Sequence, residues 1–142
     1  MASIKLAATV EVDDEFLSDI IAVALEGGIG YWSQADQIVR ESEYGVVLTM
    51  RPECNWRYRE CVLYQSNDDE SGYDEAHPLK LDRAAIVLGL SRMLDFGNDL
   101  KVAMRYRTTT LEAVVEKDAG NIDAELADII VQVALLNDIV YG

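Results

Sequence analysis

The sequence has few of the residues that mark catalytic, metal-binding or disulfide-rich proteins. Its 142 residues include two cysteines, one histidine and two prolines. Cys54 and Cys61 form no CxxC pair and have no histidine beside them, so they make neither a zinc knuckle nor a redox motif. We expect both to be reduced core or sheet residues. His77 has no identifiable ligand or nucleophile partner and is expected to be an uninvolved surface residue.

Long apolar runs and a basic N-terminal stretch are also lacking. No segment approaches the roughly 18 uninterrupted apolar residues of a membrane span, and residues 1–16 do not have the pattern of a secretory signal. We therefore expect a soluble, cytoplasmic protein with no membrane partner.

Positive charge is scarce. Against 26 Asp and Glu stand 12 Lys and Arg, which gives a formal net charge of -14. Long-range attraction to nucleic acid or anionic lipid is therefore not expected, whereas the negative charge favours a basic protein partner.

Hydrophobic residues make up 50% of the chain, and glycine and proline together account for only 11 residues (9 and 2). This composition is typical of a packed globular chain, and the length is that of a single domain spanning residues 1–142.

Hydrophobic periodicity and capping residues predict the order of the elements. Alternation or β-favouring residues predict strands at 3–11, 46–50 and 56–64, a hairpin turn at 52–55 and an extended piece at 79–81. Helical spacing predicts helices over 13–26, 83–96 and 122–137, preceded or capped by Asp13, Asp82 and Asp123, and another within 99–117. The start of this other helix is ambiguous, because residues 105–110 favour a strand. Residues 65–78 read as a solvated loop, since Pro78 stands where a calcium loop needs glutamate.

Strands that come early and helices that come late predict an α+β fold. We expect a small antiparallel β-sheet of three to four strands, covered on one face by three to four helices.

Two helical segments are followed by similar sequences. LSDII at 17–21 reappears as LADII at 126–130, and the residues after them match at several positions up to Tyr31 and Tyr141. One interpretation is that amphipathic helices simply share leucine, isoleucine and alanine. The other is that the helices pack side by side and bring the segments that follow them close together.

These ends also carry a resemblance. EGGIGYW at 26–32 together with ADIIVQVALLNDIVYG at 127–142 resembles an uncharacterised small tailed-bacteriophage protein family, with Glu-Gly-Gly and Tyr-Trp after an early helix and a Val-Tyr-Gly-like C-terminal tail. Gly30 and Asn137 depart from the residues that this resemblance leads us to expect. The resemblance implies a phage origin and no particular reaction.

Tyr31 and Trp32 have two interpretations. The glycines before them follow a helix C-terminus, so they do not form a phosphate-binding loop of the kinds that open a helix. The aromatic residues either enter the core after a tight turn or form a shelf for a planar ligand.

The arginines gather in two alternating pairs, Arg57/Arg59 and Arg105/Arg107. In a strand, residues two apart share a face, so each pair would present two guanidinium groups to an anion. Ion pairs with the surplus carboxylates are the alternative.

We therefore hypothesise a non-enzymatic phage counter-defence protein that binds and sequesters a small anionic nucleotide-type ligand, a signal of host antiviral defence, in the host cytoplasm. The predicted ligand-binding residues are Tyr31, Trp32, Arg57, Arg59, Arg105 and Arg107, with Tyr31 and Trp32 near at least one arginine pair. No catalytic residue, metal or cofactor is predicted, and a pocket between protomers of a homo-oligomer would exclude water. The alternative is an acidic, DNA-mimic-like or protein-binding inhibitor of a host enzyme; a structural or assembly module without a ligand is a third.

Overall fold

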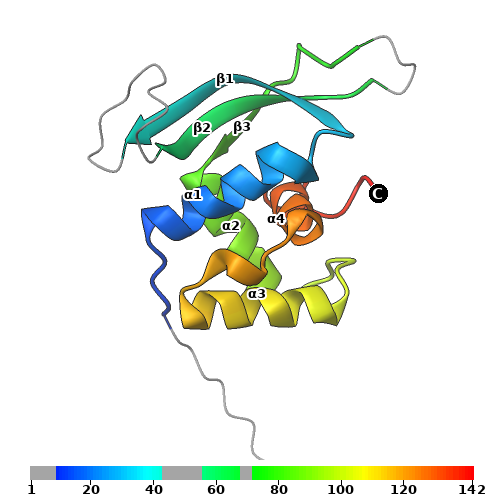
Figure 1. Ribbon diagram of the computed structural model, residues 1–142. Helices are drawn as coiled ribbons and strands as arrows, with labels where there is room; N and C mark the ends of the chain where they lie inside the picture. Colours follow the sequence, from blue (N-terminus) through cyan, green and yellow to red (C-terminus); the bar gives the residue numbers. More distant parts are fainter. Residues whose placement is uncertain (1–8, 43–55, 68–71) are drawn as a thin grey trace, which may run out of the picture.

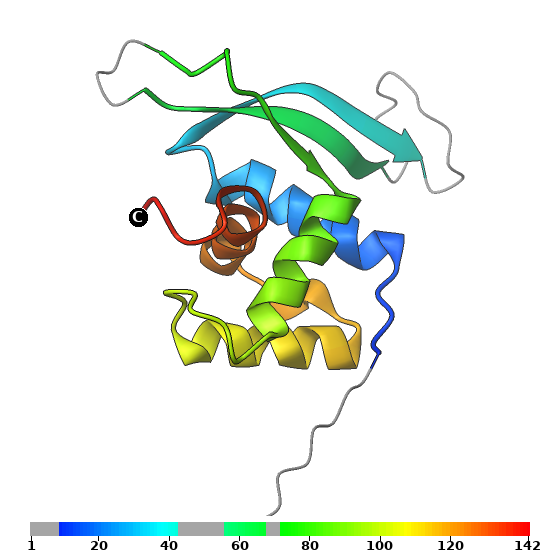
Figure 2. The same cartoon turned by 180° about the vertical axis from the view of Figure 1, so that it is seen from behind.

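The computed structural model describes residues 9–42, 56–67 and 72–142. In these residues a three-stranded antiparallel sheet lies over a group of helices (Figures 1 and 2), which confirms the predicted α+β class. The sheet has the order β1-β2-β3. In chain order the elements are α1 (Asp14–Val23), η1 (Ala24–Gly28, a turn of π-helix), β1 (Ser33–Ser42), β2 (Trp56–Gln65), β3 (Leu79–Asp82), α2 (Arg83–Leu94), α3 (Met104–Glu116), η2 (Ala119–Asn121, a 3₁₀ turn) and α4 (Ala124–Leu136).

Three helices begin at the aspartates that the sequence predicts as caps. The side chains of Asp13, Asp82 and Asp123 each accept a hydrogen bond of 2.8 Å from the backbone N–H three residues later. Each cap satisfies one of the N–H groups that a helix start leaves without an intrahelical partner. The starts of α1, α2 and α4 were therefore predicted correctly.

Other predictions need correction. Residues 9–11, the described end of the strand predicted at 3–11, belong to no strand, whereas β1 was not predicted. The predicted strand at 46–50, the turn at 52–55 and Cys54 lie outside the described residues. The helix predicted within 99–117 is confirmed as α3, and the β-favouring residues 105–110, which made its start ambiguous, are helical.

The matching helical segments pack together, as one interpretation of the sequence predicts. Their buried apolar side chains belong to one core cluster. At Gly28, an added Cβ would lie 2.7 Å from the carbonyl oxygen of Ala124, so the absence of a side chain lets η1 approach α4. Eight apolar residues of the two segments are buried: Leu17, Ile20, Ile21, Ala24, Leu126, Ile129, Ile130 and Val133.

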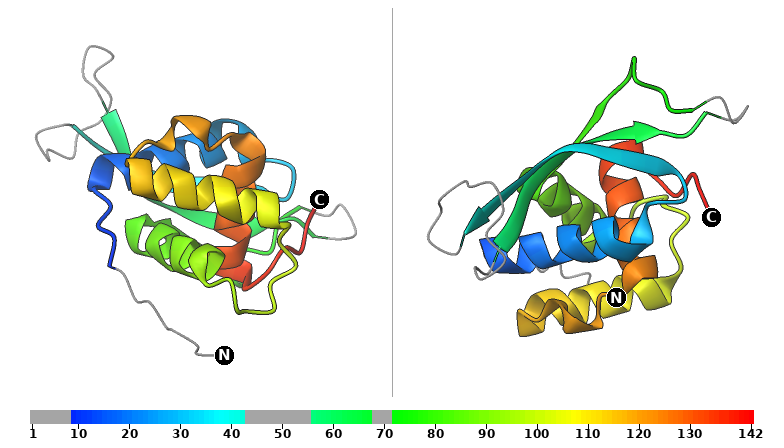
Figure 3. Two further views of the ribbon diagram at one scale, coloured as in Figure 1. Left: turned by 90° about the horizontal axis from the view of Figure 1, so that it is seen from below. Right: turned by 45° about the horizontal axis from the view of Figure 1, so that its top comes forward.

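A second close approach joins α2 to α4. A Cβ at Gly89 would lie 2.7 Å from the carbonyl oxygen of Ile130 and 3.0 Å from the Cβ of Ala134. The two helices can therefore lie at this separation only with glycine at this position. Figure 3 shows α4 running between the other helices, and Figures 1 and 2 place α3 farthest from the sheet. None of the helices described is long and apolar enough to cross a membrane.

Candidate ligand pocket

The predicted residues Tyr31 and Trp32 both reach one carboxylate on α4. The Tyr31 hydroxyl donates to Oδ2 of Asp128 at 2.5 Å, and Nε1 of Trp32 donates to Oδ1 at 2.8 Å. Asp128 is only 7% exposed, and Trp32 is buried. The two aromatic residues thus have different places: Trp32 enters the core, whereas Tyr31 remains 57% exposed at the surface.

Gln132, one helical turn after Asp128, links this carboxylate to the end of the chain. Its Nε2 donates to Oδ1 of Asp128 at 2.9 Å, while its Oε1 accepts the N–H groups of Val140 and Tyr141 at 2.8 and 2.9 Å. The Tyr141 ring stacks on Trp32 with centroids 5.1 Å apart and planes within 7°. The segments that follow the two matching helices therefore meet, as the second interpretation predicts.

A pocket of about 470 Å³ opens beside this network, and we call it the tyrosine pocket. A volume of this size suits a small organic group or an amino-acid side chain with its backbone. Its lining comes from η1, α3, α4 and the tail: Gly27, Gly28, Tyr31, Tyr106, Ala124, Glu125, Asp128, Ile129, Gln132, Ile139, Tyr141 and Gly142.

The charged residues that line the tyrosine pocket are acidic. They are Glu125 and Asp128, and no Lys, Arg or His of the described residues lines it. Glu125 accepts a hydrogen bond from the Tyr106 hydroxyl at 2.6 Å. Among the described residues, no cationic nitrogen lies within 4 Å of the Asp128 carboxylate. The three side chains that bond to Asp128 are all uncharged donors.

Tyr31 keeps its proton in this setting. Burial, followed by the hydrogen bond to Asp128 and the charge of that carboxylate, raises the pKa of Tyr31 to about 12. Each cause disfavours the phenolate, which would lose hydration and be repelled by the carboxylate. The Tyr31 hydroxyl is therefore a fixed donor to Asp128 at neutral pH.

The arginine pair of α3 does not share a face, so the sequence-based placement of Arg105/Arg107 was wrong. Residues two apart in a helix point about 200° apart. Arg107 is 3% exposed, and its guanidinium donates to the carbonyl of Asp95 at 2.7 Å and to Oδ1 of Asn98 at 2.5 Å. Arg107 therefore ties α3 to the segment after α2.

Arg105 lies at the edge of the tyrosine pocket. Its guanidinium is centred 4.7 Å from the ring of Tyr106, and Nη2 donates to the Tyr106 hydroxyl at 2.9 Å. Of the predicted site residues, Tyr31 lines the pocket, Trp32 bonds to the Asp128 carboxylate of the pocket wall, and Arg105 contacts Tyr106, which is a lining residue. Arg57 and Arg59 lie on β2 and do not line this pocket.

Arg59 borders a smaller hollow, which we call the basic hollow. It has a volume of about 210 Å³ and is lined by Arg59, Glu60, Lys80, Asp82, Arg83 and Ala84. Nζ of Lys80 lies 3.3 Å from Oε2 of Glu60, and Arg83 is paired with Glu41 and Asp14. Nε of Arg59 lies 4.0 Å from Oε1 of Glu60, so the alternative of an ion pair with a surplus carboxylate applies to Arg59, and the other two cations of the hollow are paired as well.

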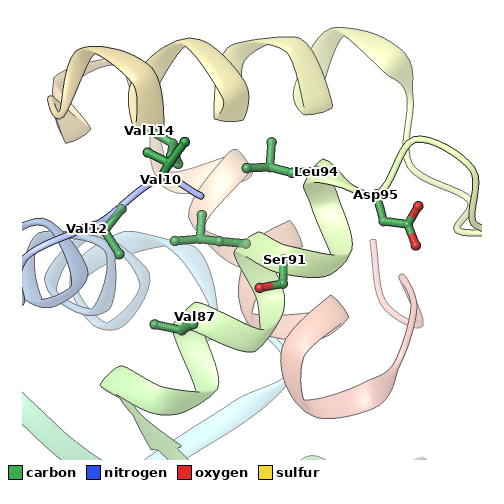
Figure 4. A pocket seen from close by; sticks show the side chains of 8 residues that line it. Val10, Val12, Val87, Ser91, Leu94, Asp95 and Val114 are labelled. Atoms are coloured by element: carbon green, nitrogen blue, oxygen red, sulfur yellow. The ribbon is translucent and has the colours of Figure 1, made fainter. Parts of the chain in front are cut away.

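A third hollow, the apolar groove, lies between α2, α3 and the segment before α1. Its volume is about 360 Å³. Figure 4 shows its valines and Leu94 gathered between the helices, with Asp95 at one end. It offers few polar groups to select a ligand. Its lining residues are Val10, Val12, Val87, Leu90, Ser91, Leu94, Asp95 and Val114.

The Cys61 thiol and the His77 imidazole do not line these three hollows. Burial, and then the charge of Glu60, raises the pKa of the Cys61 thiol to about 12, so it is not a thiolate nucleophile at neutral pH. Within the described ranges, no three His, Cys, Asp or Glu side chains are placed to hold a metal ion. The ring of His77 is exposed and lies 3.0 Å from Oδ2 of Asp74.

Comparison with protein-family models, with curated proteins and with solved structures finds no match to this chain.

Sequence reasoning missed Asp128, Gln132 and Tyr106. A signal for the first two exists, because they are the polar residues, four apart, within the apolar run LADIIVQVALL. Residues four apart lie on the same face of a helix, so a polar pair in such a run indicates a buried hydrogen-bonded site. Tyr106 carries no comparable signal.

Proposed function

We propose that this chain is a non-enzymatic binding protein, and that its tyrosine pocket takes a cationic group of a basic protein partner. This develops the alternative of an acidic, protein-binding inhibitor. The resemblance to small tailed-bacteriophage proteins gives the proposal its context, in which the partner is a host enzyme with a basic surface.

The observation that carries the proposal is Asp128. It is a buried carboxylate in a pocket wall, held by three uncharged donors and without a cation among its described neighbours. A carboxylate removed from water is stabilised by a positive charge, and a cation placed beside it gains more than it would at an exposed surface. Asp128 therefore favours a ligand of positive charge.

The other walls have the same preference. Tyr31, Tyr106 and Tyr141 bring aromatic rings to the pocket, and Glu125 adds a second carboxylate. Aromatic faces attract cations through their quadrupole. At long range, the net charge of -14 steers basic partners toward the chain.

An anionic ligand meets opposition in the tyrosine pocket, because it would approach Glu125 and Asp128. A nucleotide-type ligand is a second candidate at the basic hollow, where Arg59, Lys80 and Arg83 stand together at the start of α2. Binding there requires the anion to compete with Glu60 and Asp82 for the same cations.

Calorimetric titration tests the proposal with the tripeptides Gly-Arg-Gly, Gly-Lys-Gly and Gly-Glu-Gly and with cyclic nucleotides. We expect the cationic peptides to bind and the acidic peptide not to bind. Glu125→Gln removes one charge from the pocket and should weaken binding of the cationic peptides several-fold, by about 1 kcal/mol. Glu116→Gln removes the same charge from the end of α3 and is the matched control.

Raising the salt concentration should further weaken binding of the cationic peptides, because exposed charges are screened over about 8 Å at physiological ionic strength. Absence of binding by both cationic peptides would refute the proposal. Binding of a cyclic nucleotide that Arg59→Ala abolishes would favour the basic hollow instead.

A further inference from the structure

The edge of the tyrosine pocket already holds a cation of the chain itself. Arg105 lies over the Tyr106 ring at 4.7 Å and donates to its hydroxyl, which in turn donates to Glu125. We propose that Arg105 is a built-in competitor of the ligand, and that the ligand group is a guanidinium, as in an arginine side chain. The inference rests on the proposed function of the tyrosine pocket.

The position of Arg105 in its helix supports this inference. It is the second residue of α3, where the positive end of the helix dipole disfavours a cation. Adjacent residues of a helix also do not face each other, so an arginine does not reach its neighbour's ring by default. The guanidinium nevertheless lies over the Tyr106 ring and bonds to its hydroxyl, which indicates that this edge attracts guanidinium groups.

The observed contact also selects among cations. A guanidinium is planar, so it can stack on a tyrosine ring while its N–H groups donate in the plane toward oxygen acceptors. An ammonium is compact and strongly hydrated, and it lacks this flat face. The ring of Tyr106 and the oxygens of Tyr106 and Glu125 together provide the surface and the acceptors that a guanidinium uses.

Removal of Arg105 should therefore improve binding of a guanidinium ligand, since it frees the Tyr106 face and removes a like charge. An anionic ligand would show the opposite effect, because it would lose an attractive charge. The direction of the change in affinity thus separates the two ligand classes.

The experiment compares wild type, Arg105→Ala and Arg57→Ala by calorimetric titration with N-acetyl-arginine amide. Arg57→Ala removes the same charge from β2, outside the tyrosine pocket, and serves as the matched control. N-acetyl-lysine amide and neutral N-acetyl-citrulline amide are the comparison probes. Because Arg105 is exposed, Arg105→Ala is expected to fold, and circular dichroism checks this.

Arg105→Ala should bind the arginine probe roughly two- to fivefold more tightly than wild type, the range of one exposed cation–π contact. Arg57→Ala should stay within a factor of about 1.5, because distant exposed charges are screened. The lysine probe should bind more weakly than the arginine probe, and the citrulline probe should show no gain.

Equal or weaker binding of the arginine probe by Arg105→Ala would overturn the competitor role, as would an equal gain in Arg57→Ala. Tighter binding of the lysine probe than of the arginine probe would overturn the ligand class. If wild type binds cations without any gain in Arg105→Ala, this inference fails and the proposed function stands. If neither cationic probe binds to either protein, both fail.

Discussion

The tyrosine pocket and the apolar groove are held in place by different interactions. Around the pocket, Asp128 and Gln132 are buried polar residues whose hydrogen bonds reach the segment between η1 and β1 and the tail. Among the described residues, no buried side-chain nitrogen or oxygen lacks a hydrogen-bond partner. The groove is lined mainly by valine and leucine side chains from three segments.

This difference decides how specific each surface is. Hydrogen bonds between buried groups require particular distances and angles, so the network fixes the place of the rings that line the pocket. Apolar contacts have no preferred direction, so the groove selects a ligand by its shape and apolar surface rather than by its charge. A ligand that must be recognised by its charge therefore finds its site at the pocket.

The largest expected change in the free energy of unfolding comes from shortening a buried leucine near each surface. Leu126→Ala should lower the free energy of unfolding by roughly 2 to 5 kcal/mol, because it leaves a cavity between α4 and its neighbours. Leu90→Ala should cost less, since Leu90 lines the groove and the lost volume opens to solvent. Urea unfolding of both variants measures the two costs, and a larger cost for Leu90→Ala would contradict the comparison.

The second prediction concerns the polar network. Asp128→Ala should destabilise the protein by about 2 to 3 kcal/mol, because it leaves the buried donors of Trp32 and Gln132 without their acceptor. Val87→Ser in the groove should cost less than about 0.5 kcal/mol, because Val87 is 42% exposed. Denaturant titration of both variants gives the difference, and equal costs would show that the network does not stabilise the pocket.

The smallest expected effect comes from the Tyr31 hydroxyl. Tyr31→Phe should cost about 1 kcal/mol near neutral pH, the contribution of one hydrogen bond. The raised pKa of about 12 means that this stabilisation is fully present below about pH 10, the ordinary pKa of tyrosine, and is lost as the pH rises through 12.

The difference in unfolding free energy between wild type and Tyr31→Phe should therefore shrink between about pH 10 and pH 12. Tyr73→Phe removes a hydroxyl that lies away from Asp128 and serves as the control, with no such change expected. A difference that grows with pH would contradict the assigned hydrogen bond.

The sequence predicts well those elements whose start depends on local chemistry. Asp13, Asp82 and Asp123 each precede an apolar pattern of helical period, and each caps a helix. The strand at 56–64 also follows its alternation and lies within β2. In these cases the residues that form the element also carry the signal.

The elements that the sequence predicts poorly are those whose structure depends on contacts with residues far away in the chain. β1 has no clean alternation, and most of its side chains are not buried; it exists because it pairs with β2, through a register that shifts on either side of Val39. The β-favouring residues at the start of α3 are helical, and in this helix the buried guanidinium of Arg107 donates to Asp95 and Asn98, contacts distant in sequence that outweigh the local preference.

The candidate site divides in the same way. Tyr31 and Trp32 were predicted because they stand out beside the glycines, and the matching ends indicated that their segment meets the tail. Their partners Asp128 and Gln132 were missed: the polar pair in an apolar run indicates a buried site, but the helix sequence alone does not say that Tyr31 and Trp32 are the donors that reach it. Arg105 and Arg107 were predicted to share a face because residues 105–110 favour a strand. In the helix α3 they point in different directions.

Gly89 connects the packing of the protein to its recognition chemistry. It lies on α2, and its lack of a side chain lets α2 rest against α4 at Ile130, between the two positions that carry Asp128 and Gln132. The Cβ of any larger residue at position 89 would clash with the backbone of α4, the helix that positions the side chains of Asp128 and Gln132. A substitution at this position is thus expected to disturb both the core and the pocket, which Gly89 does not line. A map of tolerated substitutions would mark Gly89 as a functional residue even though it touches no ligand.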